Sequence, residues 1–83
     1  MYYFYVLKSN KDNKLYFGST SDLKRRHAEH NRGEVASTKL RRPLTLIYYE
    51  AYLDESVARE REKVVKRSGT ARQTLYNRLR IGE

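Results

Sequence analysis

The spacing of apolar side chains over the first twenty residues predicts a β-hairpin. Residues 1–8 read MYYFYVLK, and successive side chains of a strand point to opposite faces, so both faces of this segment are aromatic or aliphatic. The next residues, SNKDN, are typical of a turn, and LYFGS then resumes the strand pattern. We therefore expect residues 2–19 to form two antiparallel strands.

The segment that follows predicts a helix from about Asp22 to Asn31 with an unusual inward face. Its apolar residues are only Leu23 and Ala28, and spacings of three and four place on one face Leu23, Arg26, His27 and His30. Leu23 has to face the core, so Arg26 turns the same way and needs an anionic partner, for which a substrate phosphate is a candidate. His27 is interpreted as a packing or rim residue.

The remaining pattern predicts one more strand and two more helices. Gly33 is a candidate left-handed cap, and 33–43 is a polar, basic connection ended by Pro43. Residues 44–53, LTLIYYEAYL, are apolar on both faces, which predicts an interior strand covered on both sides. Asp54 is expected to cap a helix that runs through about Ser68. Thr70 and Gln73 resemble a capping box for a last helix over 71–80.

The predicted order is strand–strand–helix–strand–helix–helix, an α+β domain with a small three-stranded sheet flanked by helices. The apolar positions of the second helix are Val57, Ala58, Val64 and Val65. Glu60 and Glu62 then lie equally far from the centre of this arc, on opposite flanks. The periodicity favours neither as the acidic site residue, and Glu50 and Glu55 are further candidates. Arg61 falls near the middle of the arc, and we expect its side chain to snorkel to the surface.

Composition narrows the class of protein. The 83 residues are enough for a single domain spanning 1–83, and the absence of cysteine excludes disulfides and thiolate zinc sites. We find no membrane-span pattern, no signal-peptide pattern and no phosphate-binding glycine loop, so we expect a cytoplasmic protein without a nucleotide cofactor. The net charge of +8 and pI near 9.9 favour a nucleic-acid partner.

The positive charge is concentrated in one stretch. Residues 24–42 hold seven Lys and Arg against two Glu, which favours contact with phosphates. The candidate nucleic-acid-binding residues are Lys24, Arg25, Arg32, Lys39, Arg41 and Arg42. The pattern lacks a helix with base-reading side chains, so we expect recognition of shape or backbone.

The candidate chemistry is phosphodiester hydrolysis. That reaction needs a base for the attacking water, a cation for the charge on the phosphate oxygens, and usually a carboxylate that anchors a metal ion. Strand tyrosines, the Arg–His helix face and a glutamate on the second helix supply such a set.

The spacing of these residues resembles a known family. Tyr5 and Tyr16 are eleven apart, the sequence Tyr16-Phe17-Gly18 leads into a helix, and Arg26 and His30 follow ten and fourteen residues after Tyr16. With the downstream KRR, EHN and AxxxE segments, the chain resembles the GIY-YIG nuclease family. It is most similar to the small stand-alone members called the UPF0213 or YhbQ-like group.

The resemblance assigns roles to particular residues. It implies catalytic roles for Tyr5, Tyr16, Arg26 and His30, one Mg²⁺ or Mn²⁺ ion on Glu62, and a structural turn at Gly18. The first motif of the family has glycine and isoleucine where this chain has Tyr3 and Phe4. The residues do not decide which of Tyr5, Tyr16 or His30 is the general base.

We therefore expect a metal-dependent DNA endonuclease, with DNA repair or processing as its candidate role. The alternatives are a non-catalytic nucleic-acid-binding module on the same fold, or a protein-interaction domain whose charge serves solubility. A domain of this size fits a monomer or weak dimer. The strandedness of the substrate, and the choice between DNA and RNA, stay open at this point.

Overall fold

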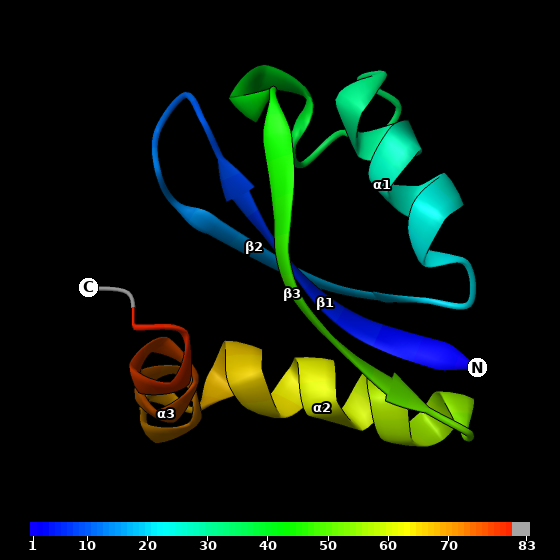
Figure 1. Cartoon of the computed structure of the whole chain (residues 1–83), viewed down its shortest axis with the longest axis vertical. Helices are drawn as coiled ribbons and strands as arrows, with labels where there is room; N and C mark the ends of the chain where they lie inside the picture. Colours follow the sequence, from blue (N-terminus) through cyan, green and yellow to red (C-terminus); the bar gives the residue numbers. More distant parts are fainter. Residues whose placement is uncertain (81–83) are drawn as a thin grey trace.

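The computed structural model describes residues 1–80 and has the predicted α+β architecture. Its elements are β1 (Tyr2–Ser9), β2 (Leu15–Thr20), α1 (Leu23–Asn31), a short 3-10 turn (Lys39–Arg41), β3 (Leu44–Tyr52), α2 (Glu55–Arg67) and α3 (Gly69–Leu79). The three strands are antiparallel and lie in the order β2-β1-β3. Helix α1 lies on one side of the sheet, and α2 with α3 lies on the other (Figure 1). Within residues 1–80 no helix has the length and apolar character needed to cross a membrane.

Each face of the sheet supports its own apolar cluster. On the α2–α3 side, Phe4 and Val6 of β1 pack with Val65 of α2 and Leu75 of α3. On the α1 side, the buried cluster consists of Tyr5, Leu7 and Leu44, with Leu23 and Tyr16 packed against it. The alternation predicted for the first strand is thus confirmed, and β1 is the strand with neighbours on both sides.

The prediction that residues 44–53 form an interior strand is wrong. Strand β3 lies at the edge of the sheet and pairs with β1, with a shift in register between Val6 and Leu7 of β1. Its two faces are apolar because helices lie on both sides of the sheet: Leu46 packs in the α1-side cluster, whereas Tyr48 packs in the cluster on the other side. The apolar residues on both faces of β3 therefore reflect helices that cover both faces of the sheet, and they do not show that β3 lies between two other strands.

The starts of α1 and α2 agree with the sequence, and the cap of α3 differs from the predicted one. Asp22 accepts a hydrogen bond from the Arg25 amide at 3.0 Å, and Asp54 accepts one from the Ser56 amide at 3.0 Å. The predicted capping box at Thr70 is wrong: Ser68 caps α3, since its hydroxyl accepts from the Ala71 amide at 3.1 Å. Ser68 ends α2 and begins α3, so the two helices meet without a separate loop.

Gly33 has the left-handed conformation expected of it. Its φ is +79°, and its amide donates to the carbonyl of His30, the last buried residue of α1. A glycine avoids the steric cost of this conformation.

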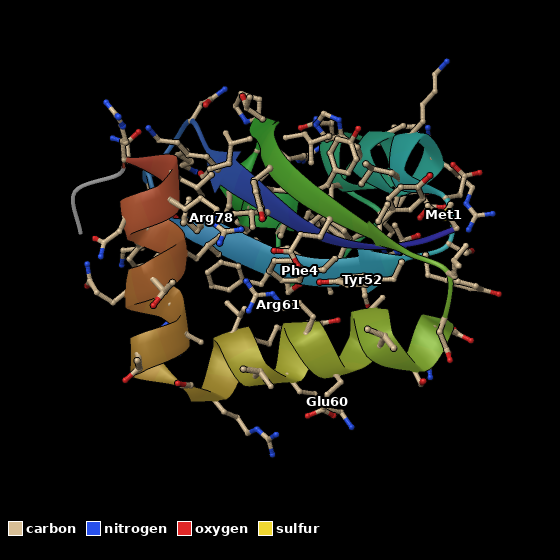
Figure 2. The ribbon with its side chains drawn as sticks, turned by 60° about the horizontal axis from the view of Figure 1, so that its bottom comes forward. Met1, Phe4, Tyr52, Glu60, Arg61 and Arg78 are labelled. Carbon is tan, nitrogen blue, oxygen red and sulfur yellow. The ribbon has the colours of Figure 1, made fainter. Side chains whose placement is uncertain are left out.

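The inward face of α2 is rotated away from the predicted arc. Ala58 and Val65 are buried, but Val57 is 46% exposed. Arg61 does not snorkel: its guanidinium makes a two-pronged ion pair with Glu50 of β3, at 2.9 Å and 3.2 Å, and lies 5.5 Å from the centre of the Phe4 ring. Figure 2 shows Arg61 between α2 and the sheet, beside Phe4 and Tyr52. The periodicity was thus right to place Arg61 on the inward face, but the expected snorkelling is wrong because Glu50 neutralises the guanidinium there.

Candidate active site at the edge of the sheet

Four residues implied by the resemblance lie together on the α1 side of the sheet. The rings of Tyr5 and Tyr16 are 6.4 Å apart, and the ring of His30 lies 5.8 Å from Tyr5 and 4.9 Å from Tyr16. Arg26 lies one helical turn before His30, on the same face of α1. The inward face of α1 predicted from its spacing is therefore real, and it meets both strand tyrosines.

Tyr5, His30 and Thr38 form a buried chain of hydrogen bonds. The Tyr5 hydroxyl and His30 Nε2 are 2.8 Å apart, and His30 Nδ1 and Thr38 Oγ1 are also 2.8 Å apart. The exposed fractions of the three residues are 1%, 0% and 0%. The two buried hydrogen bonds, one at each ring nitrogen, fix the orientation of the imidazole.

The surroundings of Thr38 assign the tautomer of His30. Thr38 Oγ1 also lies 3.4 Å from the carbonyl oxygen of Val35, to which only its hydroxyl hydrogen can be donated. We therefore assign the imidazole proton to Nδ1, where it is donated to Thr38 Oγ1, and this leaves Nε2 to accept the proton of the Tyr5 hydroxyl.

Burial keeps this chain of residues uncharged near neutral pH. Burial of the ring lowers the pKa of His30 to about 4, and the charges of Arg26 and His27 act in the same direction. Burial raises the pKa of Tyr5 to about 12, although its hydrogen bond with Arg26 acts in the opposite direction. Tyr5 is thus a neutral phenol hydrogen-bonded to a neutral imidazole.

Arg26 brings a partly exposed cation to this chain. Its Nη1 donates to Glu29 Oε1 at 3.1 Å, and its side chain is 37% exposed. The anionic partner expected for this arginine is therefore Glu29 in this structure. The exposed part of the guanidinium stays available for a second anion.

Glu62 reaches the same region from the opposite side of the sheet, at the edge formed by β2. Its Oε1 accepts from Ser19 Oγ of β2 at 2.7 Å, and its Oε2 accepts from Lys66 Nζ at 2.6 Å. The ammonium of Lys66 lies 5.8 Å from the centre of the Tyr16 ring, so it links Glu62 to the tyrosine side of the site. Ser19 also lines a cleft of about 230 Å³ between the end of β2 and the start of α2.

The structure distinguishes Glu62 from Glu60. Glu60 is 62% exposed and pairs with Arg67 at 3.8 Å, and Figure 2 shows it on the side of α2 that faces away from the sheet. Glu62 is 22% exposed and bonded to β2. Of the two flanks of α2, the one that carries Glu62 is therefore the one at the sheet edge.

The donor atoms at Glu62 fit a weakly held Mg²⁺ or Mn²⁺ ion. Residues 1–80 contain no group of three or more His, Cys, Asp or Glu side chains placed to enclose a metal. One carboxylate and the neighbouring Ser19 hydroxyl are oxygen donors at an accessible edge, and Mg²⁺ is commonly held by one or two carboxylates together with water and substrate phosphate. A full set of ligands would thus require the substrate.

Gly18 is not a turn residue, contrary to the expectation from the sequence. It lies within β2, which continues to Thr20, directly opposite Tyr5 of β1. A Cβ atom built on Gly18 would lie 2.5 Å from both Cζ and the hydroxyl oxygen of Tyr5. The glycine is needed because the Tyr5 ring crosses directly over the backbone of β2.

His27 is a packing residue, as expected. Its Nε2 donates to the carbonyl oxygen of Leu44 at 2.9 Å. Asn31 bonds the same residue twice, since its Oδ1 accepts from the Leu44 amide and its Nδ2 donates to the Leu44 carbonyl. Together these bonds attach the end of α1 to the beginning of β3.

The candidate phosphate-contacting residues have different surroundings. Lys24 and Arg25 are exposed on the first turn of α1, with Arg25 3.6 Å from Glu29. Arg41 is half-buried and pairs with Asp12 of the hairpin turn at 3.1 Å. The other candidates are exposed near Gly33 and the 3-10 turn: Arg32, Lys39 and Arg42. Arg41 thus has a structural partner that the sequence did not reveal.

Three residues in contact with the candidate site were not predicted from the sequence: Thr38, Ser19 and Lys66. Thr38 lies in the polar connection, and Ser19 is one residue past the second motif. Neither residue belongs to a periodicity or motif that would have marked it as part of the site. Lys66 follows Glu62 by four residues on a helix, which is the spacing of an ion pair. Only Lys66 had a signal that could have identified it.

Comparisons with known proteins place the chain in a family. Residues 1–80 match the model of the GIY-YIG catalytic domain, and the chain belongs to this family. Within it, the chain is 44% identical over 78 residues to a UPF0213 protein of Lactiplantibacillus plantarum, covering 90% of this chain and 76% of that protein. A UPF0213 protein of Listeria welshimeri is 41% identical over 76 residues, covering 90% and 83%.

A solved structure agrees with these sequence matches. The solution NMR structure of a UPF0213 protein from Bacillus halodurans superposes with a TM-score of 0.58 at 30% identity, covering 93% of this chain and 84% of that one. The resemblance to the UPF0213 group of the GIY-YIG nuclease superfamily is thus confirmed, and membership of that superfamily indicates a nucleic-acid substrate.

Proposed function

We propose that this protein is an endonuclease that hydrolyses phosphodiester bonds in DNA with the help of one Mg²⁺ or Mn²⁺ ion. The observation that carries the proposal is the convergence of Tyr5, Tyr16, Arg26, His30 and Glu62 at the edge of β2 from β1, β2, α1 and α2. These residues are distant in sequence, and a phenol, an imidazole, a guanidinium and a carboxylate are the groups that the reaction needs.

The proton of the attacking water is assigned to the Tyr5–His30 pair. A neutral phenol is a weak base, but Tyr5 can accept a proton from water while it passes its own hydroxyl proton to His30 Nε2. Both nitrogens of His30 are bonded within the protein, so we propose that it acts through Tyr5 rather than directly on the water. This assignment favours Tyr5 among the three candidates for the base.

Tyr16 and Arg26 are assigned to the phosphate side of the reaction. Tyr16 is half-buried, and we propose that its hydroxyl orients the water or a phosphate oxygen. The exposed edge of the Arg26 guanidinium would bind two phosphate oxygens and stabilise the negative charge that grows on them in the transition state. Its bond to Glu29 holds it in position for that role.

Glu62 is the residue that would hold the divalent ion. When bound, the ion would supply charge stabilisation and assist departure of the leaving oxygen. Ser19 orients the carboxylate by donating to Oε1, as second partners of metal-binding carboxylates usually do.

The proposal is tested by incubating labelled single-stranded, duplex and branched DNA with the protein in Mg²⁺, Mn²⁺ or EDTA. Wild type is compared with Arg26→Ala and Glu62→Ala, and DNA binding is measured in parallel. Metal-dependent cutting by wild type alone, with DNA binding retained in the variants, supports the endonuclease. Salt-sensitive binding without cutting under any metal would instead favour the non-catalytic binding module.

A further inference from the structure

Lys66 forms an ion pair with the carboxylate of Glu62, the group that would hold the metal ion in the proposed function. Its ammonium donates to Glu62 Oε2 at 2.6 Å, while Ser19 donates to Oε1, so both carboxylate oxygens are already engaged. A glutamate and a lysine four residues apart often pair on the surface of a helix. Here the pair differs from a surface pair because the carboxylate is also bonded to a strand and the ammonium faces the Tyr16 ring.

A divalent ion and the Lys66 ammonium cannot share this position at low cost. Both would lie within a few ångströms of Oε2, where like charges repel. Ser19 bonds the other carboxylate oxygen, and its neutral hydroxyl does not repel a cation. Binding of a divalent ion to Glu62 would therefore displace Lys66.

The displaced ammonium has a short path to substrate. Lys66 is 47% exposed at the side chain, and its flexible four-carbon stem allows the ammonium to swing while α2 stays in place. The side chain already lies beside Tyr16, whose ring contacts His30 and the rest of the site. A phosphate bound between Arg26 and Tyr16 would be the nearest anion to which it could move.

We propose that Lys66 is an exchangeable counterion of the site: it neutralises Glu62 when no metal is bound, and on metal binding it moves to a phosphate of the substrate strand. This inference rests on the proposed function, because it requires Glu62 to bind the metal. It makes Lys66 a specificity-determining residue for a polyanionic substrate.

The first measurement is the affinity for Mn²⁺ in the absence of DNA. The electron paramagnetic resonance signal of the free ion reports how much Mn²⁺ stays unbound. Wild type is compared with Lys66→Met, Glu62→Gln and Lys63→Met, the last of which removes the same charge from an exposed position of the same helix. Lys66→Met should bind Mn²⁺ about three- to fivefold more tightly, which is the scale of one partly exposed ion pair. Lys63→Met should change the affinity less than twofold, and Glu62→Gln should lose the site.

The second readout is the salt dependence of DNA binding, measured with Mn²⁺ and with EDTA in a Tyr5→Phe background, which keeps Arg26 and is expected to slow cleavage at least ~100-fold. Adding Lys66→Met should lower the slope of log affinity against log salt by about one with Mn²⁺, as expected for one lost phosphate contact, and by less with EDTA. Adding Lys63→Met should not reproduce this dependence on metal.

The outcomes separate the inference from the proposed function. If Glu62→Gln binds Mn²⁺ as wild type does, Glu62 is not the metal residue, and both the metal part of the proposed function and the exchange are overturned. If Glu62→Gln loses Mn²⁺ but Lys66→Met binds it no more tightly than wild type, the exchange alone is overturned. A salt slope that Lys66→Met lowers equally with Mn²⁺ and with EDTA also contradicts it.

Discussion

Gly18 and Tyr5 face each other across β2 and β1, and the phenol of Tyr5 lies directly over the glycine backbone. The Cα atoms are register partners, and a Cβ on Gly18 would meet the hydroxyl end of the ring at 2.5 Å. That hydroxyl is the atom bonded to His30. Because Gly18 has no Cβ atom, the Tyr5 hydroxyl, the proposed proton acceptor, can lie at this position.

Replacing Gly18 with alanine should damage activity more than stability. The added methyl group pushes the Tyr5 hydroxyl away from His30 Nε2, and we expect cleavage to fall at least ~100-fold, in the range typical of lost general-base catalysis. Overpacking should cost about 1–3 kcal/mol of unfolding free energy. Single-turnover cleavage and urea denaturation measure the two effects.

Gly69→Ala is the matched control. The nearest atom to a Cβ at Gly69 is 3.8 Å away, at the exposed first position of α3. We expect unchanged cleavage and a gain of roughly 0.4–1 kcal/mol from the stiffer unfolded chain. Equal losses of activity in the two variants would contradict the role given to Gly18.

Burial of His30 should make the protein less stable in mild acid. Its folded pKa of about 4 lies below the ordinary value of 6.5, so the unfolded chain binds more protons between these pH values. The contribution is complete above pH 6.5, falls as the pH decreases from 6.5 to 4, and amounts to up to about 3 kcal/mol. Urea denaturation of wild type and His30→Gln at several pH values measures this slope.

His27→Gln supplies the control for that experiment, because it leaves His30 in place. We expect it to keep most of the wild-type pH slope, because burial is the largest cause of the lowered pKa of His30 and the charge of His27 a smaller one, whereas His30→Gln should flatten the slope between pH 6.5 and 4.5. Identical slopes in wild type and His30→Gln would show that His30 is not held neutral by its surroundings.

The ion pair between Arg61 and Glu50 should stabilise the fold and the orientation of α2. Glu50 also accepts hydrogen bonds from the hydroxyls of Tyr48 and Tyr52, so removal of Arg61 leaves a largely buried carboxylate without its cation. We expect Arg61→Met to cost about 2–3 kcal/mol, somewhat below the loss for a fully buried pair. Arg59→Met, which breaks an exposed pair with Glu55, should cost less than about 0.5 kcal/mol.

Local patterns predicted those features of the fold that depend on local chemistry. The hairpin, the start of α1 at about Asp22, and α2 with its Asp54 cap follow from alternation, helical spacing and short polar side chains. The edge position of β3 was not predictable in this way, because an apolar pattern on both faces reports helices above and below and says nothing of strand order. Which strand β3 pairs with depends on contacts between residues far apart in the sequence, and a local pattern does not contain them.

The candidate site shows the same limit. The choice between Glu60 and Glu62 depends on the rotation of α2, and the Arg61–Glu50 pair and the burial of Val65 accompany that rotation. The periodicity placed Arg61 on this inward face, but its ion pair could not be anticipated because the partner, Glu50, lies eleven residues earlier on a strand. Thr38 was missed for a related reason: it is buried by tertiary contact in a segment whose sequence reads as exposed loop.

The exposed basic residues should contribute to DNA affinity through phosphate contacts. We expect Lys24→Ala, Lys39→Ala and Arg42→Ala each to lower the salt slope of DNA binding by about one, with little dependence on sequence. Arg41→Ala should in addition destabilise the fold, because Arg41 binds Asp12 and the Leu15 carbonyl. Salt-dependent binding isotherms and urea denaturation distinguish these cases, and salt slopes that stay at the wild-type value would exclude these residues from the interface.

The central claim is that Tyr5, bonded to His30, accepts the proton of the attacking water. The most direct test is single-turnover DNA cleavage by wild type and Tyr5→Phe in Mn²⁺, with the affinity for DNA measured on the same preparations. We predict that Tyr5→Phe binds DNA within twofold of wild type and cleaves at least ~100-fold more slowly. Cleavage by Tyr5→Phe at the wild-type rate would contradict the account and move the base to another group of the site.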